Sequence, residues 1–365
     1  MMTASLLCVL QQGTPFDYGM GERLLLFLII GIAVLLAFAI GFAVSVILLR
    51  LKNQRKAVKW NSLERKWDEA ILTALEGDQE LSTFWDLVAP DEEMFCVNYI
   101  MRYARWLTGV ERERAIELAQ PYLHRIVPRA NARDAQRRAR AIQTLGELGL
   151  AKHSDIVTQA LDDQSPLVAM VAARALARKE HPQFLRPVLS HLHRFTTWSP
   201  NFLASLLAAV GPEAAPDLRD VLQDSSRPPN VRAVVATALG YIYDYSAADV
   251  AAVVLEVERE KELVTACLRL MGRVGRENHL PLVRGFIASA DFAVRAAAAS
   301  ALGSLGREED LVRLRDACED DSRWVALHAA RALRDAGDVE SLQTLAASGQ
   351  ARATLALQVL SEMDE

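Results

Sequence analysis

The chain has 365 residues, 51% of them hydrophobic and 24% charged, and its formal net charge is −5. This length suits one long domain or two of ordinary size. The acidic balance excludes a protein built to coat nucleic acid, which would carry a basic surplus, so we expect no nucleic-acid partner.

The first predicted element is a membrane-spanning helix. Residues 24–49 form an apolar run that contains no charged side chain. About 20 apolar residues suffice to cross the hydrocarbon core, whereas the apolar part of a cleavable signal peptide has about 7–15. We therefore predict a permanent single transmembrane helix over residues 23–50, preceded by a short extracytoplasmic N-terminus over residues 1–22.

A basic cluster follows the apolar run and predicts its orientation. No acidic residue interrupts this cluster, which consists of Arg50, Lys52, Arg55, Lys56 and Lys59. Because the flank richer in Lys and Arg stays in the cytoplasm, we expect the N-terminus outside and the rest of the chain inside, at a bacterial inner membrane. The basic cluster either acts as this topology signal alone or also lies at the membrane surface against anionic lipid headgroups.

Small residues form a stripe along the predicted span. They recur at four-residue steps, which place them on one face of a helix: Ala33, Ala37, Gly41 and Ser45. Such stripes allow two helices to approach closely within a bilayer. The stripe predicts membrane helix packing, either as a homodimer through the transmembrane helix or with a membrane partner, unless the small residues merely reflect the usual composition of such spans.

Residues 51–130 follow as a juxtamembrane segment and a helical N-terminal cap. Four of the six tryptophans fall here, at Trp60, Trp67, Trp85 and Trp106. The segment does not match the regular units that come after it. Because terminal repeats are commonly atypical, we predict a divergent cap.

Residues 131–349 contain seven units of nearly constant length. Each unit has one apolar residue, here called its repeat anchor, and the anchors are Leu145, Leu176, Leu207, Leu239, Met271, Leu302 and Leu333. The steps between consecutive anchors are 31, 31, 32, 32, 31 and 31 residues. Apolar residues also recur eight, four and three positions before most anchors, which is the pattern of one face of an α-helix.

Each anchor is followed by a turn and a second amphipathic helix. A glycine four positions after the anchor predicts where the first helix ends, as in Gly149, Gly275 and Gly306. A glycine directly after the anchor, such as Gly303, suits close packing between helices. One hairpin cannot bury its apolar face alone, but stacked hairpins share a core. We therefore predict an all-α fold, with one transmembrane helix before an α-solenoid of about seven helix-turn-helix repeats of 31–32 residues, and a C-terminal capping helix and tail over residues 350–365.

The units resemble HEAT repeats, in particular the short bacterial variety also called phycobilin-lyase-type repeats. The resemblance is carried by the segments VRAAAASALGSLGREEDLVRLRDACED and VALHAARALRDAGDVESLQTLAAS, and it covers about residues 132–349. It implies the solenoid fold and says almost nothing about function.

The sequence offers no catalytic residue, cofactor site or metal site that we can name. It contains no GxxxxGK[ST] or GxSxG motif, and its four cysteines lie far apart. Relatives with similar repeats bind iron through His-Glu dipeptides, and this sequence has none. We therefore expect a protein that is not an enzyme and carries no cofactor.

The resulting hypothesis is a membrane-anchored scaffold or adaptor. Its cytoplasmic solenoid would bind a protein partner that is itself membrane-associated, as an accessory subunit of a membrane complex such as envelope polysaccharide, glycosyltransferase or secretion machinery. The alternative is a lyase-type HEAT-repeat enzyme, or an enzyme chaperone that handles a cofactor. Arginines that recur in the units form either solvated salt bridges or part of a groove for an acidic or mixed peptide.

Overall fold

The structure is a computed structural model that describes residues 18–76, 81–348 and 352–363, without the side chains of residues 18–26 and of Lys56. The described residues form helices and turns and contain no strand, which confirms the all-α prediction. The chain divides into two compact units, residues 1–95 and 96–365, with the boundary inside helix α3 (Glu93–Ala104).

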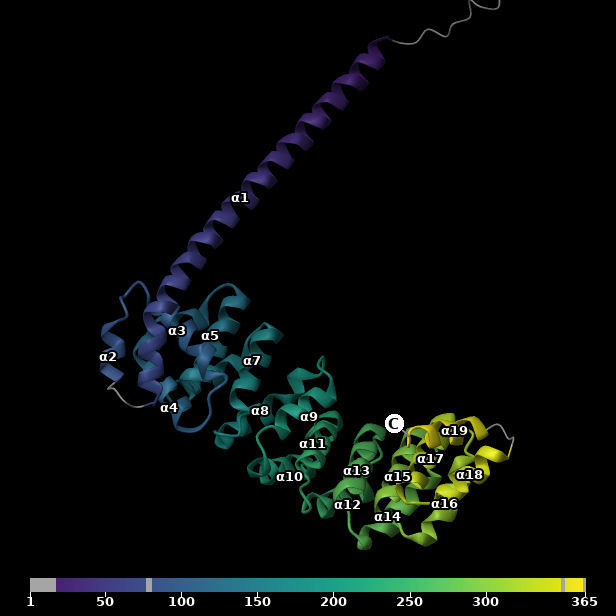
Figure 1. The fold of residues 1–365 in the computed structure, drawn as a ribbon. Helices are drawn as coiled ribbons and strands as arrows, with labels where there is room; N and C mark the ends of the chain where they lie inside the picture. The colour runs from purple at the N-terminus through teal and green to yellow at the C-terminus, as the bar shows by residue number, and fades with distance from the viewer. Residues whose placement is uncertain (1–17, 77–80, 349–351, 364–365) are drawn as a thin grey trace, which may run out of the picture. The chain divides into compact units, whose positions relative to one another are not determined.

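The first unit is dominated by helix α1 (Tyr18–Glu76), which runs for 59 residues without interruption (Figure 1). The predicted transmembrane helix, residues 23–50, and the first part of the juxtamembrane segment predicted after it both lie on this one helix. The physical reason is that residues 51–76 contain neither Pro nor Gly and are rich in strong helix formers. The short helix α2 (Leu81–Asp86) packs against α1.

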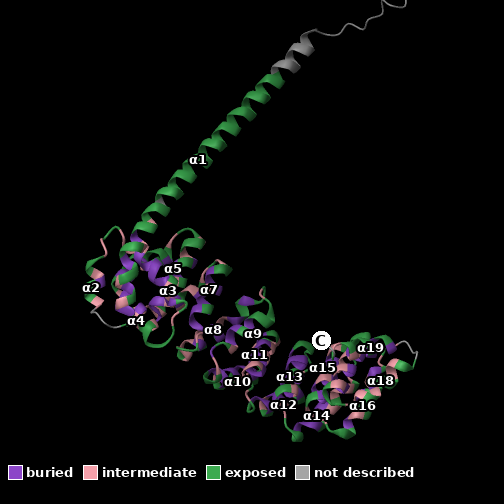
Figure 2. Cartoon of the chain, viewed as in Figure 1, coloured by how far each residue is buried: buried purple, intermediate pink, exposed green. Residues whose placement is uncertain are grey.

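Helix α1 changes character along its length. From Phe27 to Leu49 every residue is exposed, so Figure 2 draws this half of the helix as exposed throughout. Further along, Leu63, Trp67 and Ile71 recur every four residues and are buried, as expected for an amphipathic helix. Among the described residues, α1 is the one helix long and apolar enough to cross a membrane.

The second unit contains seven helical pairs. The first helices of these pairs are α5 (Ala135–Leu148), α7 (Pro166–Leu176), α9 (Pro200–Ala208), α11 (Pro229–Ile242), α13 (Lys261–Val274), α15 (Phe292–Leu305) and α17 (Arg323–Asp335). The second helices are α6 (Leu150–Gln159), α8 (Leu185–His191), α10 (Ala215–Gln223), α12 (Ala247–Val257), α14 (Leu280–Gly285), α16 (Leu311–Cys318) and α18 (Val339–Ala347).

Further helices flank and join these pairs. Helix α4 (Gly109–Ala119) precedes them and α19 (Ala353–Ser361) follows them. Short 3₁₀ turns lie at Gln120–Arg125, Val127–Asn131, Ala160–Asp162, Pro182–Phe184, Leu192–Phe195, Pro212–Ala214, Glu277–His279, Phe286–Ala288 and Glu308–Asp310. The predicted ends of the chain, residues 1–17 and 364–365, and the predicted solenoid boundary at 349–350 lie outside the described residues.

The first helices stack on one another to form the core of the solenoid, which confirms the predicted repeat architecture. All seven repeat anchors are at most 1% exposed, so each of their side chains is buried in the core. Contact is weakest between α7 and α9. Helix α9 begins at Pro200, seven positions before its anchor, whereas the other first helices each begin ten positions before theirs. It therefore lacks the turn that its neighbours use for packing.

Glycine ends three first helices for a steric reason. Gly149, Gly275 and Gly306 donate their N–H to the carbonyl of the repeat anchor four residues earlier. Gly306 has φ −65°, so it does not use the left-handed conformation that favours glycine. A Cβ at Gly306 would instead lie 2.3 Å from the Leu302 carbonyl oxygen, which leaves no room for any side chain.

Ion pairs tie neighbouring repeats together. Arg284 on α14 donates from Nε to Asp310 Oδ1 at 2.6 Å and from Nη2 to Oδ2 at 2.8 Å, and Asp310 is fully buried. The Arg307 N–H also donates to Asp310. Burial raises the pKa of Asp310, but the hydrogen bonds from Arg284 and the Arg307 N–H outweigh it and hold the pKa below 3.8. The ionised carboxylate therefore stabilises the fold above that pH, and the contribution is lost as pH falls through the lowered pKa.

Replacing Asp310 by Asn should lower the free energy of unfolding by about 1.5 kcal/mol at pH 7, because Arg284 loses its main counter-charge in a buried position. The matched change is Asp162→Asn, since the Asp162 side chain is 69% exposed and its pair with Arg194 lies at 3.0 Å. For that variant we expect a loss below about 0.5 kcal/mol. Urea unfolding of the full chain, followed by circular dichroism, measures both. Two results would contradict the role of the buried carboxylate: an equal loss of unfolding free energy in the two variants, or a difference between the unchanged chain and Asp310→Asn that does not become smaller below pH 3.8.

Candidate functional site: a groove across the first helices

The residues predicted to act at the membrane lie on α1. Ala33, Ala37, Gly41 and Ser45 are all exposed, and a Cβ added to Gly41 would meet no atom within 4 Å. The structure thus leaves this stripe open along the helix.

The basic cluster also lies on α1, where Arg50, Lys52, Arg55 and Lys59 are exposed; the Lys56 side chain lies outside the described residues. Lys59 Nζ contacts Asp91 Oδ2 at 2.8 Å, and this hydrogen bond lowers the pKa of Asp91. Lys59 Nζ also lies 5.3 Å from the centre of the Phe95 ring.

Most of the arginines that recur in the repeats form ion pairs with acidic residues of the fold. Arg295 donates to both oxygens of Asp320, at 2.7 and 2.9 Å, and Arg138 pairs with Asp163 in the same way. Further pairs join Arg232 to Glu258, Arg313 to Asp310, Arg315 to Asp338, and both Arg331 and Arg334 to Glu362. In the described part of the chain Arg174 is exposed and forms no ion pair. The recurring arginines are thus mainly structural.

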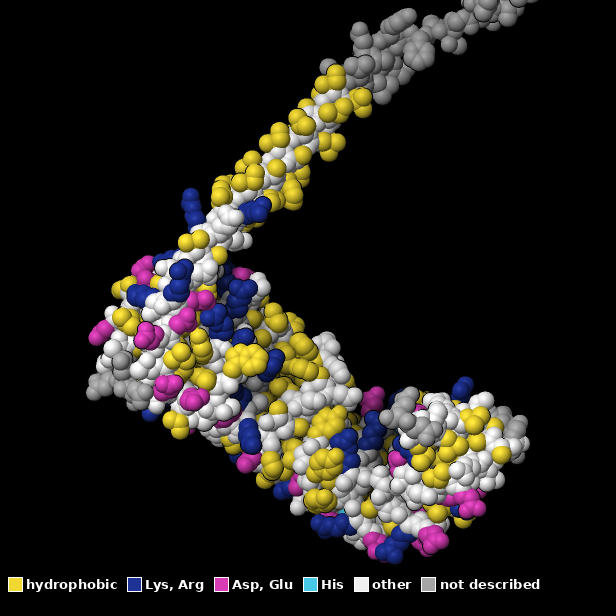
Figure 3. Space-filling view, viewed as in Figure 1, with side chains coloured by type: hydrophobic (Ala, Val, Ile, Leu, Met, Phe, Trp, Pro, Cys, Tyr) yellow, Lys and Arg dark blue, Asp and Glu magenta, His cyan; other side chains and the backbone are white. Residues whose placement is uncertain are grey.

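A groove that sequence reasoning did not single out crosses four first helices. It encloses about 380 Å³ and is formed by α9, α11, α13 and α15, with a lining that includes Asn201, Asn230, Thr237, Lys261, Arg269 and Phe292. A smaller cavity shares Pro200 and Asn230 with it and reaches Trp198, which stacks on Phe202 with ring centres 5.6 Å apart. Hydrophobic side chains gather on the surface over α9 and α11, with Lys and Arg side chains beside them near α13 (Figure 3).

The groove contains one exposed aromatic ring, Phe292, and two cations, and further exposed rings lie on α9 and α17 outside its lining. Phe202, Phe292 and Trp324, on α9, α15 and α17, are 40%, 51% and 50% exposed. Lys261 and Arg269 are exposed and form no ion pair among the described residues. Acidic groups are present as well: Glu262 lines the groove, and Asp291 accepts hydrogen bonds from the first turn of α15.

His328 adds a buried polar atom beside these rings. Its Nδ1 lies 2.9 Å from Ser300 Oγ, and its ring meets the Trp324 ring edge-on with centres 4.7 Å apart. Its Nε2 is buried and has no hydrogen-bond partner. Burial, followed by the charges of Arg331 and Arg269, lowers the pKa of His328, so the ring is neutral at pH 7. Among the described residues no three His, Cys, Asp or Glu side chains gather as metal ligands do.

A sequence signal for this groove exists on the helix face opposite the core. Positions nine and two before each anchor are exposed or half-buried in every repeat, and the position five before it is so in the first three repeats and the last. They hold Trp324 and His328 in the last repeat, Phe202 in the third and Arg269 in the fifth. Reading the exposed face in the same register as the buried one would have placed these residues on one surface.

Comparison with known proteins agrees with the fold. A family model of HEAT repeats matches residues 254–334. A comparison with curated proteins gave no match. Among solved structures, the complex of CpcE and CpcF of phycocyanin lyase from Nostoc shares 19% identity over 67% of this chain and 88% of that chain, with a TM-score of 0.35.

Two further structures resemble the chain to a similar degree. Human deoxyhypusine hydroxylase in complex with glycerol shares 20% identity over 68% of this chain and 100% of that chain, with a TM-score of 0.30. A Kap121p mutant shares 14% identity over 84% of this chain and 43% of that chain, with a TM-score of 0.43. These TM-scores are low, and we draw no conclusion about function from the three likenesses.

Proposed function

We propose that this HEAT-repeat protein is a membrane-anchored scaffold, held by helix α1 and binding a protein partner through the groove on its first helices. The groove carries the proposal, because its exposed Phe292 ring and Arg269, which forms no ion pair among the described residues, are residue types that protein interfaces favour at their centres.

Helix α1 supports the membrane part of the proposal. Its apolar side chains from Phe27 to Leu49 are all exposed, as bilayer-facing residues would be. With the basic cluster on the cytoplasmic side, the N-terminus lies outside and the solenoid inside, at a bacterial inner membrane. The stripe through Gly41 offers a face for a homodimer or for a membrane partner.

The partner we propose is itself at the membrane, because anchoring both proteins in one bilayer raises their effective concentration. A segment with apolar side chains and both polar and acidic groups would suit the groove, which offers the Phe292 ring, Arg269 and Lys261. An accessory subunit of an envelope polysaccharide, glycosyltransferase or secretion complex is one concrete form of this role.

Capturing the tagged full chain from its native membranes after crosslinking tests the groove. We expect the double variant Phe292→Ala, Trp324→Ala to retain about tenfold less of a specific captured protein, because buried aromatic anchors carry much of an interface's energy. Tyr245→Ala is the matched control, since Tyr245 is 59% exposed but lies in the turn between α11 and α12, away from the first helices that carry Phe292 and Trp324. Equal capture by both variants would place the interface elsewhere. A stoichiometric metal or chromophore in the purified chain would instead favour the lyase-type alternative.

A further inference from the structure

We propose that the juxtamembrane part of α1 holds one phospholipid with an anionic headgroup, in a cavity built around Arg55. The inference rests on the proposed insertion of α1 into the membrane. It assigns to the basic cluster a specific ligand in addition to a role in topology.

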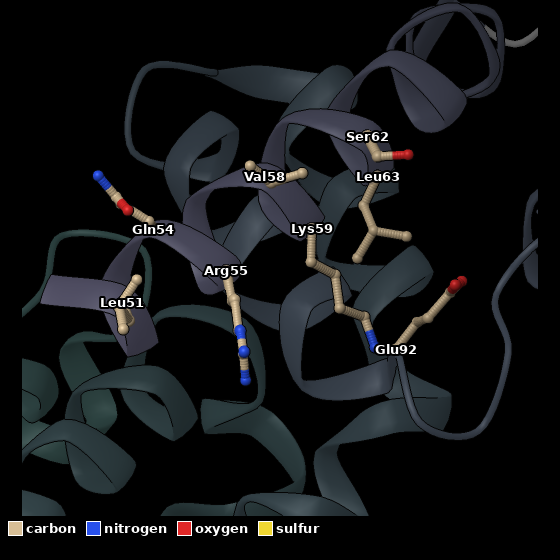
Figure 4. A pocket seen from close by; sticks show the side chains of 8 residues that line it. All are labelled: Leu51, Gln54, Arg55, Val58, Lys59, Ser62, Leu63 and Glu92. Atoms are coloured by element: carbon tan, nitrogen blue, oxygen red, sulfur yellow. The ribbon is translucent and has the colours of Figure 1, made fainter. Parts of the chain in front are cut away.

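The cavity is an open hollow of about 570 Å³ along one face of α1 (Figure 4). Its lining is mixed: Leu51, Val58 and Leu63 are apolar, Gln54 and Ser62 are polar, and Arg55 and Lys59 are cationic. Glu92, from the segment before α3, completes it. This volume falls in the range of about 300–1,000 Å³ that small-molecule sites occupy.

The charges in the cavity leave Arg55 free for a ligand. Lys59 Nζ lies 2.8 Å from Asp91, and Glu92 accepts from Lys66 Nζ at 3.0 Å and from the Ala89 N–H at 3.3 Å. Both acids near the cavity are thus already paired. Arg55 forms no ion pair in the part of the chain that the structure describes, and its guanidinium can donate two parallel hydrogen bonds to a phosphate.

The position along α1 places Arg55 close to the outer edge of the headgroup layer. Arg55 lies six residues beyond Leu49, which is about 9 Å along a helix. The headgroup layer on each side of a bilayer is about 5–8 Å thick. Since α1 continues without a break from the apolar run to Glu76, the helix fixes Arg55 just past this layer. Leu51, 46% exposed and one turn nearer the membrane, offers an apolar surface to the lipid's glycerol and upper acyl chain.

The inference predicts a preference for anionic lipid that depends on Arg55. The full chain, purified in mild detergent, is mixed with phosphatidylglycerol or phosphatidylcholine of the same acyl chains, and retained lipid is counted by native mass spectrometry. We expect the chain to retain phosphatidylglycerol selectively, and Arg55→Gln to reduce this retention about fivefold. Arg65→Gln is the matched control, because Arg65 is an exposed arginine on the same helix outside the cavity.

Three outcomes would overturn the inference: equal retention of the two lipids, equal retention by Arg55→Gln and the unchanged chain, and full displacement of the lipid by excess inorganic phosphate. The last would assign the site to free phosphate. Carbonate extraction of native membranes distinguishes a failure of the proposed lipid site from a failure of the proposed membrane anchor. A chain that resists extraction but shows no lipid preference contradicts the lipid site alone, whereas a chain released by carbonate contradicts the membrane anchor.

Discussion

Deleting residues 24–49 should move the chain from the carbonate-resistant membrane fraction to the soluble fraction. Nineteen of these 26 residues are Leu, Ile, Val or Phe, and none is charged. At about 0.4 kcal/mol for each such residue, insertion is favoured by about 8 kcal/mol, so its removal should change the distribution almost completely. Fractionation of cells followed by immunoblotting measures the result.

A length-matched span of Leu and Ala separates anchoring from helix packing. This replacement should keep the chain in the membrane, while it removes the order of small residues at Ala33, Ala37, Gly41 and Ser45. If the stripe packs against a second copy, crosslinking between copies should fall as well. A deleted chain that stays carbonate-resistant would mean that another surface binds the membrane, and it would contradict α1 as the anchor.

The sequence predicted the solenoid because its buried face repeats. Leu302 and its six counterparts occupy the same place in each unit, and a core position tolerates little besides an apolar side chain of similar size. Periodicity therefore reported both the helices and their order. The cavity contacts of Arg55 and the groove around Phe292 were not predictable in this way, because exposed positions have no such constraint and differ from unit to unit.

Helix boundaries and ion-pair partners were less accessible for other reasons. The end of the apolar run at Leu49 marks a change of surroundings, not of backbone, so hydropathy could not locate the end of α1 at Glu76. The recurrence of arginines was visible in the sequence, but the acid with which each arginine pairs was not. Asp320 lies 25 residues after Arg295, in the turn before the next repeat, and only the stacking of the repeats brings the two together.

Replacing Gly303 by Ala should destabilise the solenoid by about 2 kcal/mol. Gly303 lies on α15, where a Cβ would be 2.6 Å from both Cα and Cβ of Ala332 on α17, and 2.9 Å from its carbonyl oxygen. The backbone of α17 cannot move aside without disturbing its own core, so we expect an overpacking cost of about 3 kcal/mol. The higher helix propensity of Ala offsets about 1 kcal/mol of this overpacking cost.

The same substitution at Gly285 should have the opposite sign. Gly285 ends α14, it is exposed, and a Cβ there would meet no atom within 4 Å. Because the new methyl group meets no atom, the higher helix propensity of Ala is the main effect that remains. Gly285→Ala should therefore leave the free energy of unfolding unchanged or raise it by up to about 1 kcal/mol. Urea unfolding of the full chain gives the two values, and hydrogen exchange shows whether the Gly303 loss is concentrated in α15 and α17. Stability in a solenoid depends on contacts between neighbouring repeats. Loosening this one interface should therefore lower the hydrogen-exchange protection of α15, which carries the groove residue Phe292, and of α17, which carries Trp324. Unchanged exchange in these two helices would show that the repeats tolerate a wider spacing, and that the close approach at Gly303 does not hold the groove in shape.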